Sequence, residues 1–283
     1  MDELEQQPDC PLPAHCGPSP APPDLPPQRV ILLGASNLAR SGGRVIHALR
    51  TCCGGPVEIF AAHGHGRSYG IRSRVLVREL PGILQSGLWR ALDEHPPAPT
   101  AALVTDIGND LLYEIPVPTI VDWIDECLRR LERLQARTVM TLLPLMNLES
   151  LSPGRFRFFR TLFHPHCRLP FEEVIARAHE LNARLIRLAE ARGVCTFEPR
   201  AEWYGIDPIH LRYRSQVAAW RLIFSTWELP SGAEATGSLH RPGSLTAVRI
   251  RVAAPEKRWI LGRERSCPQP ALTLPDGTTV SLY

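Results

Sequence analysis

Five short apolar runs alternate along the chain with longer segments whose apolar residues recur at helical spacing. The runs are Val30–Leu33, Val57–Ala62, Ala101–Thr105, Val139–Leu143 and Val194–Phe197. A continuous apolar run of this length is typical of a strand that is buried on both faces of a parallel sheet. The alternation therefore predicts an α/β protein: a three-layer α/β/α sandwich around a mostly parallel five-stranded sheet.

Three helices are predicted between and after these strands. Apolar residues recur every three or four positions over 120–134, just after Pro118, and again over 171–188. Gly193 predicts the end of the second helix, which spans about 171–192. A last helix is expected at about Ser215–Thr226.

Composition divides the chain into four parts. Residues 1–28 are crowded with proline and nearly lack aliphatic side chains, which predicts a disordered segment. The α/β domain is expected over 29–229, followed by a Gly-, Ser- and Ala-rich linker at 230–245. Residues 246–283 predict a small β-rich appendage, in which Asp276-Gly277 separates two short strand-like runs as in a hairpin.

Polar residues gather where predicted strands end. Ser36 lies in Gly34-Ala35-Ser36-Asn37-Leu38, directly after the first strand, and the loops at 63–70 and 106–110 follow the next two. Much later, Asp207 and His210 stand three residues apart in one short segment. Sites in open α/β sheets form at the carboxyl ends of the strands. A serine, a histidine and an aspartate are what hydroxyl-based acyl transfer requires, because a hydroxyl is a poor nucleophile until a base removes its proton.

With these residues considered together, region 29–228 resembles the SGNH (GDSL-type) hydrolase family. The resemblance runs through four blocks in order: Gly34-Ala35-Ser36, Gly64-His65-Gly66-Arg67-Ser68, Gly108-Asn109-Asp110 and Asp207-Pro208-Ile209-His210. Four positions depart from the family pattern. Ala35 replaces the usual aspartate, Asn37 precedes Leu38, Ile107 stands where a glycine is usual, and His63 stands where asparagine is frequent.

The resemblance implies a flavodoxin-like fold and an ester hydrolase that works through an acyl-enzyme without cofactor or metal. Ser36 would be the nucleophile, His210 its base, and Asp207 the group that orients the imidazole. The backbone N–H groups of Ser36 and Gly66, with the Asn109 amide, would form the oxyanion hole. Asp110 is expected to support the loop that carries Asn109.

The expected partner is a small-molecule ester, and short acyl or acetyl groups are favoured because no long apolar groove is evident in the sequence. Ester or thioester and the oligomeric state stay open. A net charge of +3 argues against a nucleic-acid partner. The acidic first residues and the lack of a long apolar stretch predict a cytoplasmic protein that does not bind membranes, with most of its eight cysteines as free thiols.

Other interpretations remain open at this stage. Ser36 is also a residue type that caps helices. The unusual Ala35 and Asn37 around it leave open a non-catalytic binding module on the same fold, although every group that the chemistry needs is retained. A metal-dependent hydrolase would use His63 with His65, or His164 with His166. The insertion before the helix at 171 interleaves arginines with phenylalanines and predicts a short amphipathic helix over the cleft; its residues are Arg155, Phe156, Arg157, Phe158, Phe159, Arg160 and Arg168.

Overall fold

The computed structural model describes residues 28–228 and 253–283. Apart from Gln28, the predicted disordered segment 1–28 lies outside these residues. The predicted linker 230–245 and the first residues of the predicted appendage also lie outside them. The six cysteines in the described part of the chain are all free thiols.

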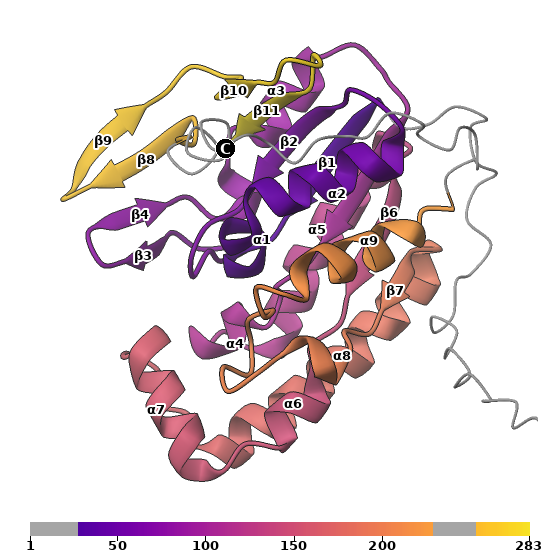
Figure 1. The fold of residues 1–283 in the computed structure, drawn as a ribbon. Coiled ribbons are helices and arrows are strands. Elements are labelled where there is room, and N and C mark those ends of the chain that lie inside the picture. The colour runs from indigo at the N-terminus through magenta and orange to yellow at the C-terminus, as the bar shows by residue number, and fades with distance from the viewer. Residues whose placement is uncertain (1–27, 229–252) are drawn as a thin grey trace, which may run out of the picture.

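A seven-stranded sheet forms the centre of the molecule, with the order β10-β11-β2-β1-β5-β6-β7 (Figure 1). The five predicted strands are β1 (Arg29–Leu33), β2 (Glu58–Ala62), β5 (Thr100–Val104), β6 (Arg137–Thr141) and β7 (Cys195–Phe197). All five pair in parallel, in the order typical of flavodoxin-like folds. The predicted fold class is therefore confirmed, whereas the predicted number of strands is wrong.

The two additional strands come from the predicted C-terminal β-rich region. Strands β10 (Leu272–Thr273) and β11 (Thr279–Leu282) form an antiparallel hairpin around Asp276-Gly277, as predicted. Strand β11 also pairs in parallel with β2 and so extends the central sheet. A salt bridge of 2.6 Å joins Asp276 in the hairpin turn to Arg50 in helix α2 (Gly43–Cys53).

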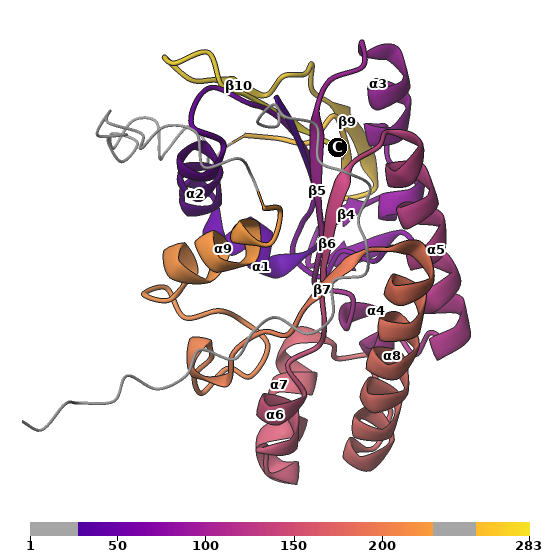
Figure 2. The same ribbon diagram turned by 90° about the vertical axis from the view of Figure 1, so that its right-hand side faces the viewer.

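Helices cover both faces of this sheet (Figure 2). One face carries α1 (Ser36–Ser41), α2 (Gly43–Cys53) and α9 (Gln216–Ser225), and the other carries α3 (Leu88–Glu94), α5 (Val117–Arg133) and α8 (Phe171–Arg192). Successive β1 side chains enter opposite cores: Ile31 and Leu33 enter one, Val30 and Leu32 the other. All four are almost fully buried. This two-sided burial explains why the strand sequences are continuously apolar.

The three predicted helices are present as α5, α8 and α9. Helix α8 ends at Gly193, which adopts the left-handed conformation (φ 63°) and returns its N–H to the last turn. Proline precedes both α5 and α8, where its missing N–H costs no hydrogen bond.

A second, smaller sheet lies beside β2. Its four strands pair antiparallel, in the order β3 (Ser73–Val75), β4 (Arg78–Leu80), β8 (Lys257–Ile260) and β9 (Arg263–Ser266). Strands β3 and β4 lie in the segment that follows β2, whereas β8 and β9 come from the predicted appendage. The described residues from 253 onward thus contribute two strands to each of the two sheets.

Three short helices lie beyond the carboxyl ends of the strands: α4 (Asn109–Leu112), α6 (Leu145–Glu149) and α7 (Pro153–Phe163), as Figure 1 shows. Helix α7 is the helix predicted from the alternating arginines and phenylalanines. Single turns of 3-10 helix occur at Ile83–Gln85 and Ala201–Trp203. In the two described stretches, none of the helices has the length and apolarity needed to cross a lipid bilayer.

Candidate active site

The carboxyl ends of β1 and β5 lie side by side at the centre of the sheet. From β1 the chain continues to β2 on one side, and from β5 to β6 on the other. Ligands of open α/β sheets bind in the crevice that such a reversal of direction creates. Ser36 follows β1 and Asn109 follows β5, so both sequence-predicted residues lie at this crevice.

Ser36, His210 and Asp207 form a continuous hydrogen-bonded chain. His210 Nδ1 lies 2.6 Å from Asp207 Oδ2, and His210 Nε2 lies 2.9 Å from Ser36 Oγ. Because a carboxylate only accepts, the neutral imidazole carries its proton on Nδ1, and Nε2 is left to accept the serine proton. Ala35, not Ser36, is the N-cap residue of α1. The Ser36 hydroxyl therefore bonds the imidazole and does not cap the helix.

Asp207 is held in its ionised form. Burial raises the pKa of this carboxyl, but the hydrogen bond from His210, the His210 charge, the Ile209 N–H and the Arg40 charge together lower it below its ordinary value. The Arg40 guanidinium lies 3.4 Å away. His210 itself is 6% exposed and Ser36 is 8% exposed, so the proton path between them is largely shielded from water.

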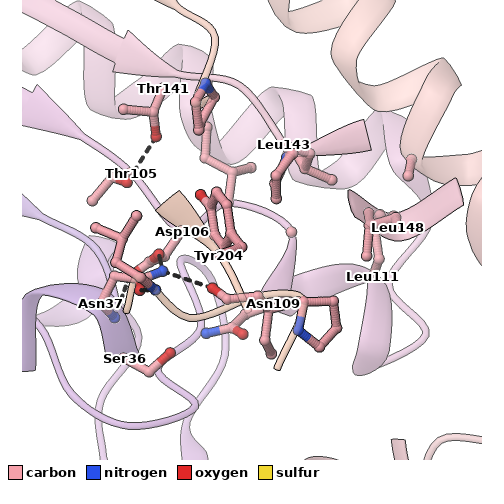
Figure 3. Close-up of a pocket in the computed structure, with 18 of the residues that line it drawn as sticks. Ser36, Asn37, Thr105, Asp106, Asn109, Leu111, Thr141, Leu143, Leu148 and Tyr204 are labelled. Carbon is pink, nitrogen blue, oxygen red and sulfur yellow. Dashed lines mark hydrogen bonds between the residues drawn. The ribbon is translucent and has the colours of Figure 1, made fainter. Parts of the chain in front are cut away.

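Asp106 and Asn37 are functional candidates that the sequence interpretation missed. The Asp106 carboxylate accepts the Ala35 N–H at 2.9 Å and the Asn37 N–H at 3.0 Å, which flank Ser36. Its other oxygen accepts the Asn37 amide at 2.7 Å. Asn37 in turn donates to the Ile209 carbonyl and accepts the Leu211 N–H, each at 2.9 Å. The two residues thus join the serine turn to the segment that carries His210 (Figure 3).

The position of Asp106 beside the serine turn could not be predicted from the sequence alone. Asp106 adopts a left-handed conformation (φ 61°), which few residues with a side chain tolerate and aspartate tolerates better than most. It supplies a carboxylate at the serine turn, in a chain whose own motif has Ala35 in place of the usual aspartate. Nothing in the sequence alone indicates that the end of β5 places this carboxylate beside Ser36.

Asn109 begins α4 and lines the same pocket as Ser36 (Figure 3). Its Nδ2 atom is buried and makes no hydrogen bond to the described residues. A buried donor without a partner costs about 1–3 kcal/mol, so such groups are uncommon outside functional sites. The Asn109 amide therefore keeps a hydrogen-bond donor that no described residue uses.

Gly66 lies in the loop after β2 and has φ +62°. A Cβ atom there would lie 2.8 Å from Val75 Cγ2, so only glycine fits. The Gly66 carbonyl accepts the Tyr113 hydroxyl at 2.6 Å. Partial burial and the charges of Arg78, His210 and Arg40 lower the pKa of the adjacent His65.

Asp110 connects the two loops that flank the serine. Its carboxylate accepts the Tyr69 N–H at 2.9 Å, and so links the loop after β2 to the start of α4. Burial raises the pKa of Asp110 to about 6, although the Ser68 hydroxyl and the Tyr69 N–H act in the opposite direction. The Asp110 carboxylate therefore holds the loop after β2 against the start of α4.

A deep apolar pocket opens from Ser36 between the strand ends and the outer helices (Figure 3). Its volume is about 120 Å³. Its walls come from α4, α6, α7, α8 and α9 and include Leu111, Leu143, Leu148, Phe156, Phe163 and Val174. The Phe163 ring also meets the His210 ring edge to face, with 5.1 Å between ring centroids. Helix α7 therefore covers the site, as its sequence predicted.

Neither histidine pair considered as metal ligands belongs to a larger cluster of possible ligands among the described residues. His164 is buried, and its burial with the nearby His210 charge lowers its pKa to about 4, whereas His166 is exposed. Burial and the charges of Arg67, His65 and Arg78 lower the pKa of His63 to about 3. Among the described residues, no group of three or more His, Cys, Asp or Glu side chains is arranged to hold a metal ion.

Comparison with known proteins gave matches among solved structures, whereas no family model and no curated protein matched the chain. Esterase EstA from Pseudoalteromonas sp. is 12% identical, covers 71% of this chain and 98% of its own, and has a TM-score of 0.45. Est24, a carbohydrate acetylesterase from Sinorhizobium meliloti, is 16% identical over 70% of this chain and 97% of its own, with a TM-score of 0.49. A GDSL-like lipase from Bacteroides thetaiotaomicron is 12% identical over 71% of this chain and 88% of its own, with a TM-score of 0.45. The function proposed below depends on the residues of this chain.

Proposed function

We propose that this chain is an SGNH-type ester hydrolase that cleaves carboxylic esters through an acyl-enzyme on Ser36. The observation that carries this proposal is the unbroken chain of hydrogen bonds from Asp207 through His210 to Ser36. Ser36 and a segment that lies far along the sequence and carries both Asp207 and His210 meet in the order and at the distances that proton relay from a hydroxyl requires.

In the first half-reaction, Ser36 Oγ attacks the ester carbonyl carbon while His210 Nε2 takes the hydroxyl proton. The ionised Asp207 stabilises the resulting imidazolium. The tetrahedral intermediate then expels the alkoxide, to which His210 returns the proton. Water attacks the acyl-enzyme in the second half-reaction, with His210 again as the base, and releases the carboxylic acid and Ser36.

The negative oxygen of each tetrahedral intermediate needs hydrogen-bond donors that are already in place. The Asn109 amide, which is buried and has no partner among the described residues, suits this role best. The Ser36 N–H and the Gly66 N–H are proposed as the other two donors. Glycine at 66 allows the backbone to approach the intermediate closely.

The alternative of a non-catalytic binding module is weakened by the intact serine, histidine and aspartate chain. Binding alone does not require an imidazole between a hydroxyl and a carboxylate. The alternative of a metal-dependent hydrolase gains no support from the histidine pairs, because His164 and His166 lie in different environments. Zinc sites need three or four converging ligands.

A fluorophosphonate probe tests the proposal without knowledge of the natural ester. The Ser36 oxygen should displace fluoride from phosphorus and retain the probe, so peptide mapping should find the label at Ser36. Labelling should disappear in Ser36→Ala and persist in Ser41→Ala, since Ser41 donates instead to the Asn37 carbonyl in the same helix. Labelling of the wild type at another residue, or equal labelling of Ser36→Ala, would contradict the proposal.

Asp106→Asn should impair both stability and turnover. The amide would place an NH2 group opposite N–H donors that now meet carboxylate oxygens. We expect the free energy of unfolding in urea to fall by about 1–3 kcal/mol. Since a small displacement of a reacting group can cost up to about 100-fold, kcat should fall about 10- to 100-fold.

Asp122→Asn is the matched control for this substitution, because Asp122 is exposed on α5. It should leave both quantities unchanged. If Asp106→Asn behaved like Asp122→Asn, the carboxylate would have no role in positioning the serine turn.

A further inference from the structure

Two hollows meet at the proposed catalytic residues. The apolar pocket is lined by Ser36 and Asn109 and extends away from them under α6 and α7. A second, shallower hollow is lined by His210 and Asp207, together with Arg40, Arg212 and Arg214. Ser36 and His210, which share one hydrogen bond, therefore face different spaces.

The chemistry of ester cleavage assigns each hollow to one part of the substrate. His210 must deliver its proton to the leaving oxygen, so the alcohol has to lie beside the imidazole. The acyl carbonyl oxygen must point at the oxyanion donors, of which Asn109 is one. The acyl chain diverges from the leaving oxygen at the carbonyl carbon, so it lies on the side of Ser36 away from the alcohol, where the apolar pocket opens.

Apart from the Asn109 amide beside Ser36, several polar groups along this pocket have partners within the protein. The Thr105 and Thr141 hydroxyls bond each other at 2.7 Å, and the Asn37 amide is bonded to Asp106 and Ile209. Arg160 donates to the Leu169 carbonyl at 2.9 Å. A polar acyl group would lose its water without gaining hydrogen bonds here, whereas a hydrocarbon chain would replace water against leucine, valine and phenylalanine side chains.

We infer that the substrate carries an extended apolar acyl chain, longer than butanoyl, which lies in this pocket with α6 and α7 as its outer wall. This inference rests on the proposed ester hydrolysis. It differs from the short acyl or acetyl preference that the sequence suggested. Figure 3 shows Leu111, Leu143 and Leu148 gathered at the end of the pocket away from Ser36.

A series of p-nitrophenyl esters from acetate to octanoate tests the inference. Burying one methylene group should raise kcat/KM up to about fourfold, so octanoate should exceed butanoate by up to about 200-fold. The readout is the ratio of kcat/KM for octanoate to kcat/KM for acetate, which cancels any general loss of activity.

Two substitutions at one position should move this ratio in opposite directions. Leu148 lies half-buried on α6 and lines the pocket. Leu148→Trp should fill the far end and lower the octanoate-to-acetate ratio at least about tenfold, the value of two lost methylenes. Leu148→Ala should shift the preferred chain length upward. Met146→Trp is the matched control, because Met146 lies on the same helix and is 68% exposed.

The outcomes separate this inference from the proposed function. Acetate cleaved at least as well as octanoate, with a ratio that Leu148→Trp leaves unchanged, would overturn the acyl pocket while ester hydrolysis stands. A drop in the ratio with Met146→Trp equal to that with Leu148→Trp would also overturn it. If no ester is cleaved and the fluorophosphonate does not label Ser36, both proposals fail together. Circular dichroism of each variant identifies a loss of fold.

Discussion

Ser36→Ala and His210→Ala should each lower kcat/KM for p-nitrophenyl octanoate by about 10⁴-fold or more, and the double variant should be no worse than either one. The reason is that the hydroxyl and the imidazole act as one unit. Without the base at 2.9 Å, the serine proton has no acceptor, and without the serine, the base has no nucleophile to activate. Steady-state kinetics on the three variants measures the coupling directly.

His166→Ala is the control for this experiment, since His166 is exposed and lies outside the hydrogen-bonded chain. It should retain wild-type activity. If the double variant instead lost the product of the two single losses, Ser36 and His210 would act independently. That result would argue against a proton transfer between them.

The central fold could be predicted because its signals are local. Each core strand is buried on both faces, so its sequence is continuously apolar, and each main helix shows one apolar stripe. The edge of the sheet could not be predicted in the same way. The turn at Asp276-Gly277 predicts the β10–β11 pair, but nothing local indicates that β11 joins β2, which lies far earlier in the chain.

The candidate site shows the same difference between residues with a local sequence signal and residues without one. Ser36, Asp207, His210 and Asn109 follow predicted strands or form a short motif, so their positions could be predicted from sequence. Asp106 could not, because its role arises from the approach of two strand ends and from a left-handed backbone conformation.

The apolar pocket could not be predicted from the sequence, for a physical reason. Its lining residues come from at least six separate segments, and in each segment they look like ordinary core residues. Only their arrangement leaves space between them. An apolar pocket formed by several helices has no periodicity of its own, so no local pattern in the sequence indicates it.

Asn109→Ala should lower kcat by about 10²–10³-fold while KM changes little. The amide donates to an oxygen that is negative only in the tetrahedral intermediate and the transition states around it. An interaction made only there lowers kcat and kcat/KM equally when it is lost. Because Asn109 Nδ2 has no partner among the described residues, its removal should also cost little stability.

Two companion variants make this prediction specific. Asn109→Asp keeps the shape of the side chain but places a negative charge beside the developing oxyanion, so it should be at least as inactive as Asn109→Ala. Asn147→Ala, in which an amide that donates to the Ala201 carbonyl is lost on α6, should leave kcat unchanged. A rise in KM at constant kcat in Asn109→Ala would show that the amide binds the ground-state ester and not the intermediate, because uniform binding affects KM alone.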